Sequence, residues 1–180
     1  MKDTRNRWVA EAVALLLPIL IVSSPFLFGS RSLDGREFRA FFRSRAAYAS
    51  EMAGRDGEWP RWNSRQYAGT PFLGDLHGSL HYPPNLLYLI LPPERAFGLL
   101  FVFHMILAAL GMYRLGRYFE FRRSAAVLGG VAYGISFSVA AHMDAGNLSH
   151  YVTPALAPWV LLLILRMIKR VSMLRLERLE

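Results

Sequence analysis

The sequence contains no cysteine, so disulfide bonds, thiolate catalysis and cysteine-ligated metal sites are excluded. It also lacks a P-loop, a dinucleotide-binding glycine fingerprint and a nucleophile elbow. No internal repeat or low-complexity segment is present. Composition and hydrophobic patterning are therefore the first evidence of the fold.

Hydrophobic residues make up 53% of the 180-residue chain, and they gather in blocks separated by arginine-rich stretches. Such blocks are typical of membrane-spanning helices. The net charge of +8 would also suit a nucleic-acid-binding protein. Many of the cations, however, flank the apolar blocks, which is where they orient membrane proteins. We therefore expect an all-α, polytopic transmembrane helical bundle with no nucleic-acid partner.

The apolar blocks predict four membrane spans, at residues 8–28, 95–113, 124–142 and 153–170. About 20 apolar residues, each rising 1.5 Å, cross a hydrocarbon core of roughly 30 Å. The first block could instead be a signal peptide, but its length and Pro18 favour a retained anchor. The third block is rich in glycine, alanine and serine, which let membrane helices approach closely. The fourth is interrupted by Pro154 and Pro158.

The cations also predict the orientation of these spans. Basic residues precede the first span, fill the connection at 114–123 and end the chain, whereas residues 143–152 contain no lysine or arginine. The positive-inside rule then places the N-terminus in the cytoplasm. Residues 29–94 would form a long outer loop, because long loops translocate largely regardless of their charge.

An amphipathic helix is predicted within this loop, at residues 36–53. Phe38, Ala46 and Ala49 recur at helical spacing, with basic side chains mostly on the other side. Such a helix could lie in the headgroup layer of the membrane, or it could pack on other parts of the loop. Further along, 86–91 is apolar but too short to span, so we expect a short re-entrant or interfacial helical turn there.

Asp34 is the first candidate for chemistry, because it follows the first span at the membrane surface. A carboxylate there could act as a general base on an acceptor hydroxyl. The alternative is structural: Asp34 precedes a predicted helix, and Glu37 stands three residues later, as in a capping box.

Histidines supply the other candidates. His77 and His81 are four residues apart beside Asp75, a spacing that could bind a metal on a helix. Glycines and a proline pair around them favour a turn instead, so we assign no metal ligand. His104 lies in mid-span, where it could be functional or could simply bond to a neighbouring helix.

Several separated motifs between residues 59 and 159 resemble the bacterial YfhO-like membrane proteins, a branch of the GT-C glycosyltransferase superfamily. The motifs, in order, are WPRWNSRQYAGTPFLGD, HYPPNLLYLILPP, FHMILAALGMYRLGRYF and LGGVAYGISFSVAAHMDAGNLSHYVTPALAPWVLLL.

This resemblance implies an enzyme that transfers a sugar from a polyprenyl-phosphate carrier at the outer face of the bacterial inner membrane. It implies that Asp34 is the catalytic base, and that the chain is the N-terminal portion of a longer transferase. Arginine pairs bidentately with phosphate oxygens. The substrate-binding residues expected on this basis are Arg31, Arg36, Arg39, Trp62, Asn63, Asp75, His77 and His81. The alternative is a non-enzymatic membrane protein, such as an assembly factor or a transporter subunit.

Overall fold

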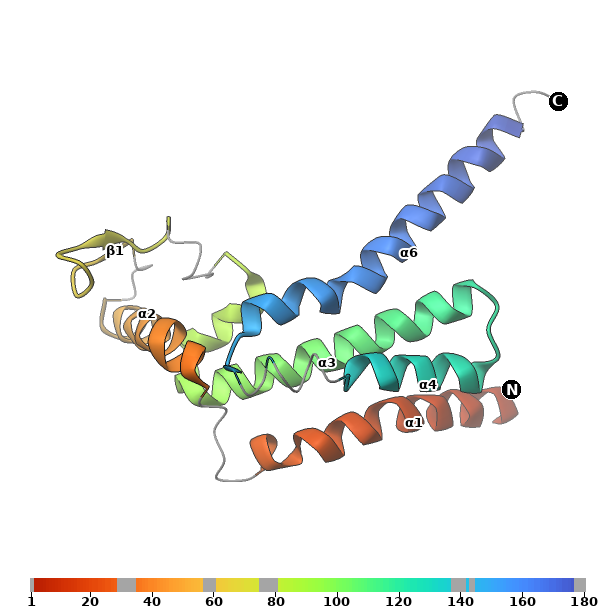
Figure 1. Cartoon of the computed structure of the whole chain (residues 1–180), viewed down its shortest axis with the longest axis horizontal. Helices are drawn as coiled ribbons and strands as arrows, with labels where there is room; N and C mark the ends of the chain where they lie inside the picture. The colour runs from red at the N-terminus through yellow and green to blue at the C-terminus, as the bar shows by residue number, and fades with distance from the viewer. Residues whose placement is uncertain are drawn as a thin grey trace. The chain divides into compact units, whose positions relative to one another are not determined.

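The computed structural model describes residues 2–28, 35–56, 61–74, 81–136, 142 and 145–176. These residues are mostly helical, which confirms the predicted all-α class (Figure 1). The elements, in chain order, are α1 (Lys2–Leu27), the π-helix η1 (Phe38–Phe42), α2 (Arg43–Asp56), β1 (Trp62–Asn63), β2 (Thr70–Pro71), the 3-10 helix η2 (Pro83–Leu89), α3 (Pro93–Tyr118), α4 (Arg123–Gly134) and α6 (Leu148–Leu176).

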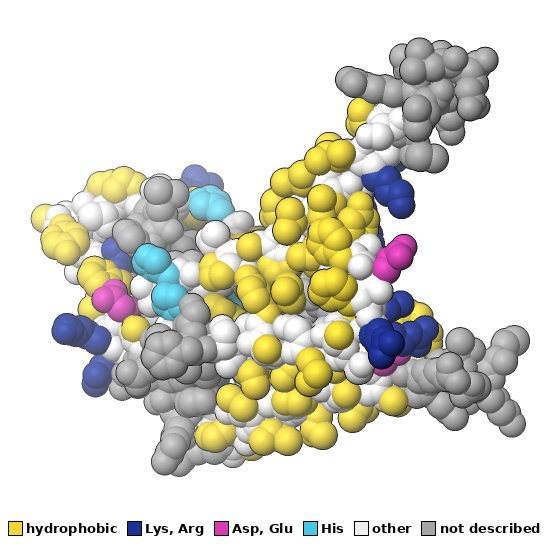
Figure 2. Space-filling view, turned by 45° about the vertical axis from the view of Figure 1, so that its right-hand side comes forward, with side chains coloured by type: hydrophobic (Ala, Val, Ile, Leu, Met, Phe, Trp, Pro, Cys, Tyr) yellow, Lys and Arg dark blue, Asp and Glu magenta, His cyan; other side chains and the backbone are white. Residues whose placement is uncertain are grey.

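Three helices within the described residues are long and apolar enough to cross a membrane. These segments are Trp8–Pro25 in α1, Pro93–Tyr118, and His150–Ser172 in α6. They correspond to the first, second and fourth predicted spans. Large apolar side chains are exposed along α1 and α6, and Figure 2 shows hydrophobic side chains covering much of the visible helical surface. A bilayer would bury this surface, so the chain is a polytopic helical membrane protein.

The third predicted span, 124–142, differs from the helix observed there. Helix α4 has 12 residues and ends at Gly134, so it rises about 18 Å at 1.5 Å per residue. Ile135 leaves the helical conformation, with φ −114° and ψ 22°. The rest of the predicted span includes 137–141, which lies outside the described residues. The described helix alone is therefore too short to cross the hydrocarbon core.

The chain divides into two compact units. The helical unit comprises Met1–Val22, Phe103–Val139 and Ser149–Glu180. The loop unit comprises Ser23–Val102 and Ala140–Leu148. Each unit has its own buried residues and its own polar contacts.

Small residues hold α3 and α4 together in the helical unit, as the glycine-rich sequence predicts. A Cβ atom on Gly130 would lie 2.7 Å from the Ala109 carbonyl oxygen and 2.7 Å from a methyl of Leu15. A Cβ atom on Gly134 would lie 2.9 Å from the Ala109 side chain. The backbones can approach this closely only because these positions lack side chains.

Polar groups of aromatic side chains join α6 to α3 and α4. Because Pro158 has no N–H, the carbonyl of Pro154, four residues earlier, loses its helical donor. The Tyr133 hydroxyl donates to that carbonyl at 2.7 Å. Trp159 Nε1 donates to the Leu107 carbonyl at 2.8 Å. The helix can therefore contain Pro158, because α4 supplies the donor that the helix backbone lacks there.

A polar cluster fixes one end of the helical unit. Arg123 Nη1 donates to Glu11 Oε1 at 2.7 Å, and the Tyr113 hydroxyl donates to the other Glu11 oxygen at 2.6 Å. The Arg123 guanidinium also lies 6.0 Å from the centre of the Trp8 ring. The basic start of the chain and the basic α3–α4 connection are therefore at the same end of this unit.

Candidate functional site

The predicted site residues fall into two groups. Arg31, Asp34, Asp75 and His77 lie outside the described residues. The other five belong to the loop unit: Arg36, Arg39, Trp62, Asn63 and His81. Arg36 and Arg39 lie at the start of the amphipathic segment, whereas Trp62 and Asn63 form β1.

The predicted amphipathic helix is present, but its first part is wound differently. The Arg43 N–H donates to the carbonyl of Phe38, five residues earlier, which is the π-helical pattern of η1. Phe38 is fully buried, and its ring centre lies 4.3 Å from that of Phe97. Arg43 Nε also donates to Glu94 Oε1 at 2.7 Å. Both contacts attach the segment to the first turns of α3.

The continuation of this segment, α2, carries the buried core of the loop unit. Tyr48 and Ala49 pack with Phe72, and Leu89 of η2 closes the cluster. The Tyr48 and Phe72 ring centres are 5.5 Å apart. The apolar face of α2 therefore packs on other parts of the loop, which was one of the two arrangements that the sequence allowed. η2 confirms the short helical turn expected near 86–91.

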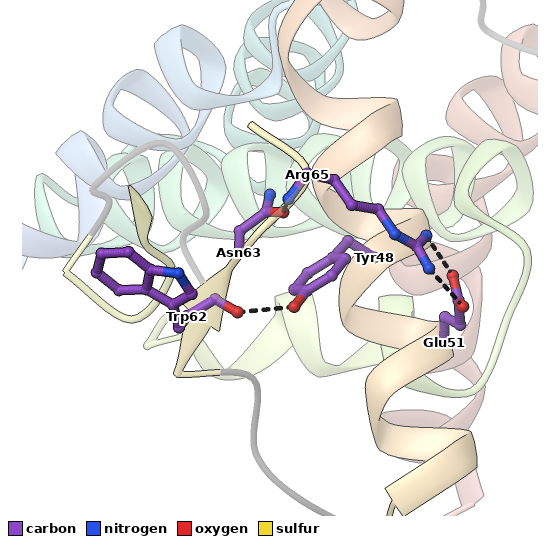
Figure 3. Close-up of polar contacts among 5 residues, drawn as sticks. All are labelled: Tyr48, Glu51, Trp62, Asn63 and Arg65. Carbon is purple, nitrogen blue, oxygen red and sulfur yellow. Dashed lines mark hydrogen bonds and ion pairs between the residues drawn. The ribbon is translucent and has the colours of Figure 1, made fainter. Parts of the chain in front are cut away.

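Tyr48 also positions β1. Its hydroxyl donates to the Trp62 carbonyl at 2.7 Å (Figure 3). The Asn63 side chain is buried, and its Oδ1 accepts a bond from the Arg65 N–H at 3.0 Å. This bond closes an Asx turn immediately after the strand. Asn63, which the sequence suggested as a substrate contact, thus has a structural bond within the turn.

An ion pair secures the same turn on α2. Arg65 donates from Nη1 and Nη2 to the two carboxylate oxygens of Glu51, at 2.6 Å and 2.7 Å (Figure 3). The hydrogen bond and charge of Glu51 raise the pKa of Arg65 above its usual value. The guanidinium also lies 5.6 Å from the centre of the Tyr48 ring. Sequence reasoning missed this pair, because no local spacing relates two residues on different elements.

The turn between the strands is conformationally strained. Tyr67, Ala68 and Gly69 all have positive φ values, of 50°, 61° and 116°. The left-handed region disfavours residues with a Cβ atom, so Tyr67 and Ala68 each carry a cost of about 1 kcal/mol or more. A Cβ atom on Gly69 would lie 2.7 Å from the Trp62 ring. Glycine thus lets the Trp62 indole cover the turn.

A cavity of about 300 Å³ opens beside this turn. Its walls come from α2, the turn, β2 and the residues just after β2. The lining residues are Arg45, Gln66, Tyr67, Thr70, Pro71 and Gly74. The lining therefore combines one cation, an amide, hydroxyl groups and two ring surfaces.

The remaining predicted residues are exposed. Arg36 and Arg39 are exposed at the start of the amphipathic segment. His81 is exposed in a turn, and its Nε2 lies 2.8 Å from the Leu73 carbonyl oxygen. A turn is the conformation that the sequence favoured for His81. Among the described residues, no group of three metal-ligating side chains comes together.

Two glycines bring the two predicted outer segments together. Gly35 follows Asp34, and a Cβ atom on it would collide with the backbone of Ala145 and Gly146. Gly146 has a φ of 73°, and a Cβ atom there would lie 2.9 Å from Phe38. The segment that begins after Asp34 therefore lies directly against the loop that precedes α6.

Comparisons with known proteins add no relative: no family model, curated protein or solved structure matches this chain.

Proposed function

We propose that this protein is a GT-C-like membrane glycosyltransferase that takes a sugar from a polyprenyl-phosphate donor at the outer face of the bacterial cytoplasmic membrane. Asp34 is the catalytic base in this proposal. Arg31, Arg36 and Arg39 attract the anionic lipid carrier to the loop unit, and the surface around Trp62 contacts the sugar. Two things support the proposal: the motifs that resemble the YfhO-like proteins, and the geometry of the loop unit.

The observation that carries the proposal is the contact between Gly35 and Gly146. It places the residue next to Asp34 against a loop from a distant part of the sequence. A membrane-surface transferase requires such convergence, because the base, the donor phosphate and the acceptor must meet outside the hydrocarbon layer. Arg36 and Arg39 come just after Gly35 in the chain and are exposed. Their guanidinium groups suit a phosphate diester.

Contacts in the structure also support the proposed orientation in the membrane. The basic chain start and the α3–α4 connection share one end of the helical unit, through the Glu11–Arg123 ion pair. By the positive-inside rule that end is cytoplasmic. The two expected outer segments instead meet within the loop unit.

Site-directed labelling tests this orientation, and the absence of cysteine makes it direct. We expect Ser44→Cys, at an exposed position of α2, to react with a membrane-impermeant maleimide on intact spheroplasts. Ser124→Cys, exposed in the first turn of α4, should react only after the membrane is opened. Labelling of Ser124→Cys but not Ser44→Cys on intact cells would reverse the topology and remove the outer-face donor site.

Lipid retention tests the function itself. Chain purified from bacterial membranes in mild detergent should carry polyprenyl phosphate, detectable by mass spectrometry of the extracted lipid. The double variant Arg36→Gln/Arg39→Gln should retain several-fold less, because it loses two cations suited to the phosphate. An assembly factor or transporter subunit has no reason to hold this lipid. If the wild-type chain and the double variant both carried only trace amounts of polyprenyl phosphate, the result would favour an assembly factor or transporter subunit.

A further inference from the structure

The cavity beside the strained turn has the size of a small-ligand site. At about 300 Å³ it lies at the lower end of the range for ligand pockets. Its residues come from four parts of the loop unit: α2, the turn between the strands, β2 and the segment after β2. Tyr48 and the Arg65–Glu51 pair hold the turn against α2. The walls are therefore fixed by contacts that the ligand need not supply.

The chemistry of the lining favours an anion attached to a polar ring. Among the described residues of the lining, Arg45 is the one that carries a charge. Arg45 Nη1 donates to the Phe41 carbonyl at 2.8 Å, which anchors the guanidinium to the preceding turn of helix. A guanidinium has five N–H donors in a planar fork, and this fork matches phosphate oxygens. Gln66 and Thr70 add groups that can bond to hydroxyls.

The aromatic part of the lining is held at an energetic cost. The Tyr67 side chain is 85% exposed, although it lines the cavity from a left-handed backbone position. The Gly69 N–H donates to the Gln66 carbonyl at 2.8 Å and helps hold the turn in this form. Strain of this kind concentrates at ligand clamps. Here it presents an uncovered ring beside a cation, where the apolar face of a sugar can lie on it.

We propose that this cavity binds the sugar phosphate of the donor, with Arg45 on the phosphate, Tyr67 against the sugar ring, and Gln66 and Thr70 on its hydroxyls. The proposal rests on the transferase function and adds four residues that were not among the expected substrate-binding residues. The group that the cavity would recognise is a hexose 1-phosphate, which could be free in solution or attached to a polyprenyl carrier.

Calorimetry on the full chain in detergent tests the site, using glucose, galactose and mannose 1-phosphates, inorganic phosphate and the free hexoses. We expect at least one hexose 1-phosphate to bind at least tenfold more tightly than phosphate or its own hexose. A second arm adds a short-chain polyprenyl phosphohexose. Tighter binding of that compound identifies the carrier-linked form, and equal binding identifies the free form. If no hexose 1-phosphate exceeds inorganic phosphate, the site does not exist.

Variants assign the binding to the cavity. Arg45→Gln should weaken hexose 1-phosphate binding at least tenfold, whereas Arg61→Gln, the same charge change at an exposed position outside the lining, should not. Tyr67→Asn should also weaken binding, while its melting temperature stays equal or rises, because asparagine tolerates the left-handed conformation. Equal weakening by Arg45→Gln and Arg61→Gln would indicate unspecific charge attraction and overturn the proposal.

The two proposals fail in different ways. If sugar transfer survives Arg45→Gln and Tyr67→Asn but is lost in Asp34→Asn, the cavity is not the donor site and the transferase remains. If hexose 1-phosphate binds in the cavity but the wild-type protein transfers no sugar to any acceptor, the site remains and the transferase function is lost.

Discussion

Replacing Asp34 by asparagine is expected to lower sugar transfer by about 10²-fold to 10⁴-fold, the range in which a positioned general base contributes. The amide cannot accept the proton of an acceptor hydroxyl. Asparagine is, however, as good a helix N-cap as aspartate, so the capping alternative predicts almost no effect from this change. Incorporation of radiolabelled sugar into the lipid or polymer fraction of membranes measures the outcome.

Glu37→Gln provides the matched control for this experiment. It removes a carboxylate three residues away and keeps the side chain's shape and its ability to complete a capping box. We expect near wild-type transfer. Membrane abundance of both variants should be unchanged, since neither alters a span. If Asp34→Asn kept full activity, Asp34 would be a helix cap only, and another residue would have to be the catalytic base.

Gly130→Leu should have the largest effect on stability. Its first side-chain atom would meet the Ala109 carbonyl oxygen, which belongs to the backbone of α3 and cannot rotate away. Overpacking of this kind costs about 1–3 kcal/mol and more where backbone must move. We expect a clear fall in the melting temperature of the detergent-solubilised chain, followed by intrinsic fluorescence.

The neighbouring residue supplies the control. A Cβ atom on Gly129 meets nothing within 4 Å, so Gly129→Leu adds the same side chain to open space. Leucine also has a higher helix propensity than glycine, by up to about 1 kcal/mol. Gly129→Leu should therefore melt at the wild-type temperature or above it. Similar destabilisation by both leucines would mean that α4 does not contact α3 through Gly130.

The long helices could be predicted because their cause is local. An apolar run such as 95–113 must satisfy its own backbone in a bilayer, and only a helix does so within one segment. The observed α3 extends to Tyr118, past two arginines whose charges can reach the headgroup layer. Pro154 and Pro158 weakened the last predicted span. Pro158 is tolerated because Tyr133, distant in sequence, replaces the donor that this proline lacks.

The loop unit was predicted less completely, because its structure depends on partners far apart in sequence. Spacing placed Phe38 and Ala49 on one apolar face, and both are buried. It did not indicate the π-helical turn, or that Trp62 would cover Gly69. The β1–β2 pair is only two residues long on each side, too short for an alternating pattern to reveal.

Candidate site residues divide in the same way. Arg36 and Arg39 were chosen for their closeness to Asp34, and both are exposed as a phosphate contact requires. Arg45 lies outside the quoted motifs, and Tyr67, although it lies within WPRWNSRQYAGTPFLGD, was not among the expected substrate-binding residues. The signal for Tyr67 is conformational: it occupies a left-handed position next to a cavity, which no composition or spacing rule reveals.

The bond between Glu11 and Arg123 has a consequence for biosynthesis. The two residues are 112 positions apart, so the carboxylate in the first span enters the membrane well before its guanidinium partner exists. At roughly 5–20 residues per second, translation takes about 6–22 s to reach Arg123. During that interval an unpaired acid must stay near the headgroups or with the insertion machinery. The first helix, α1, can therefore take its final position only after α3 and α4 have been synthesised.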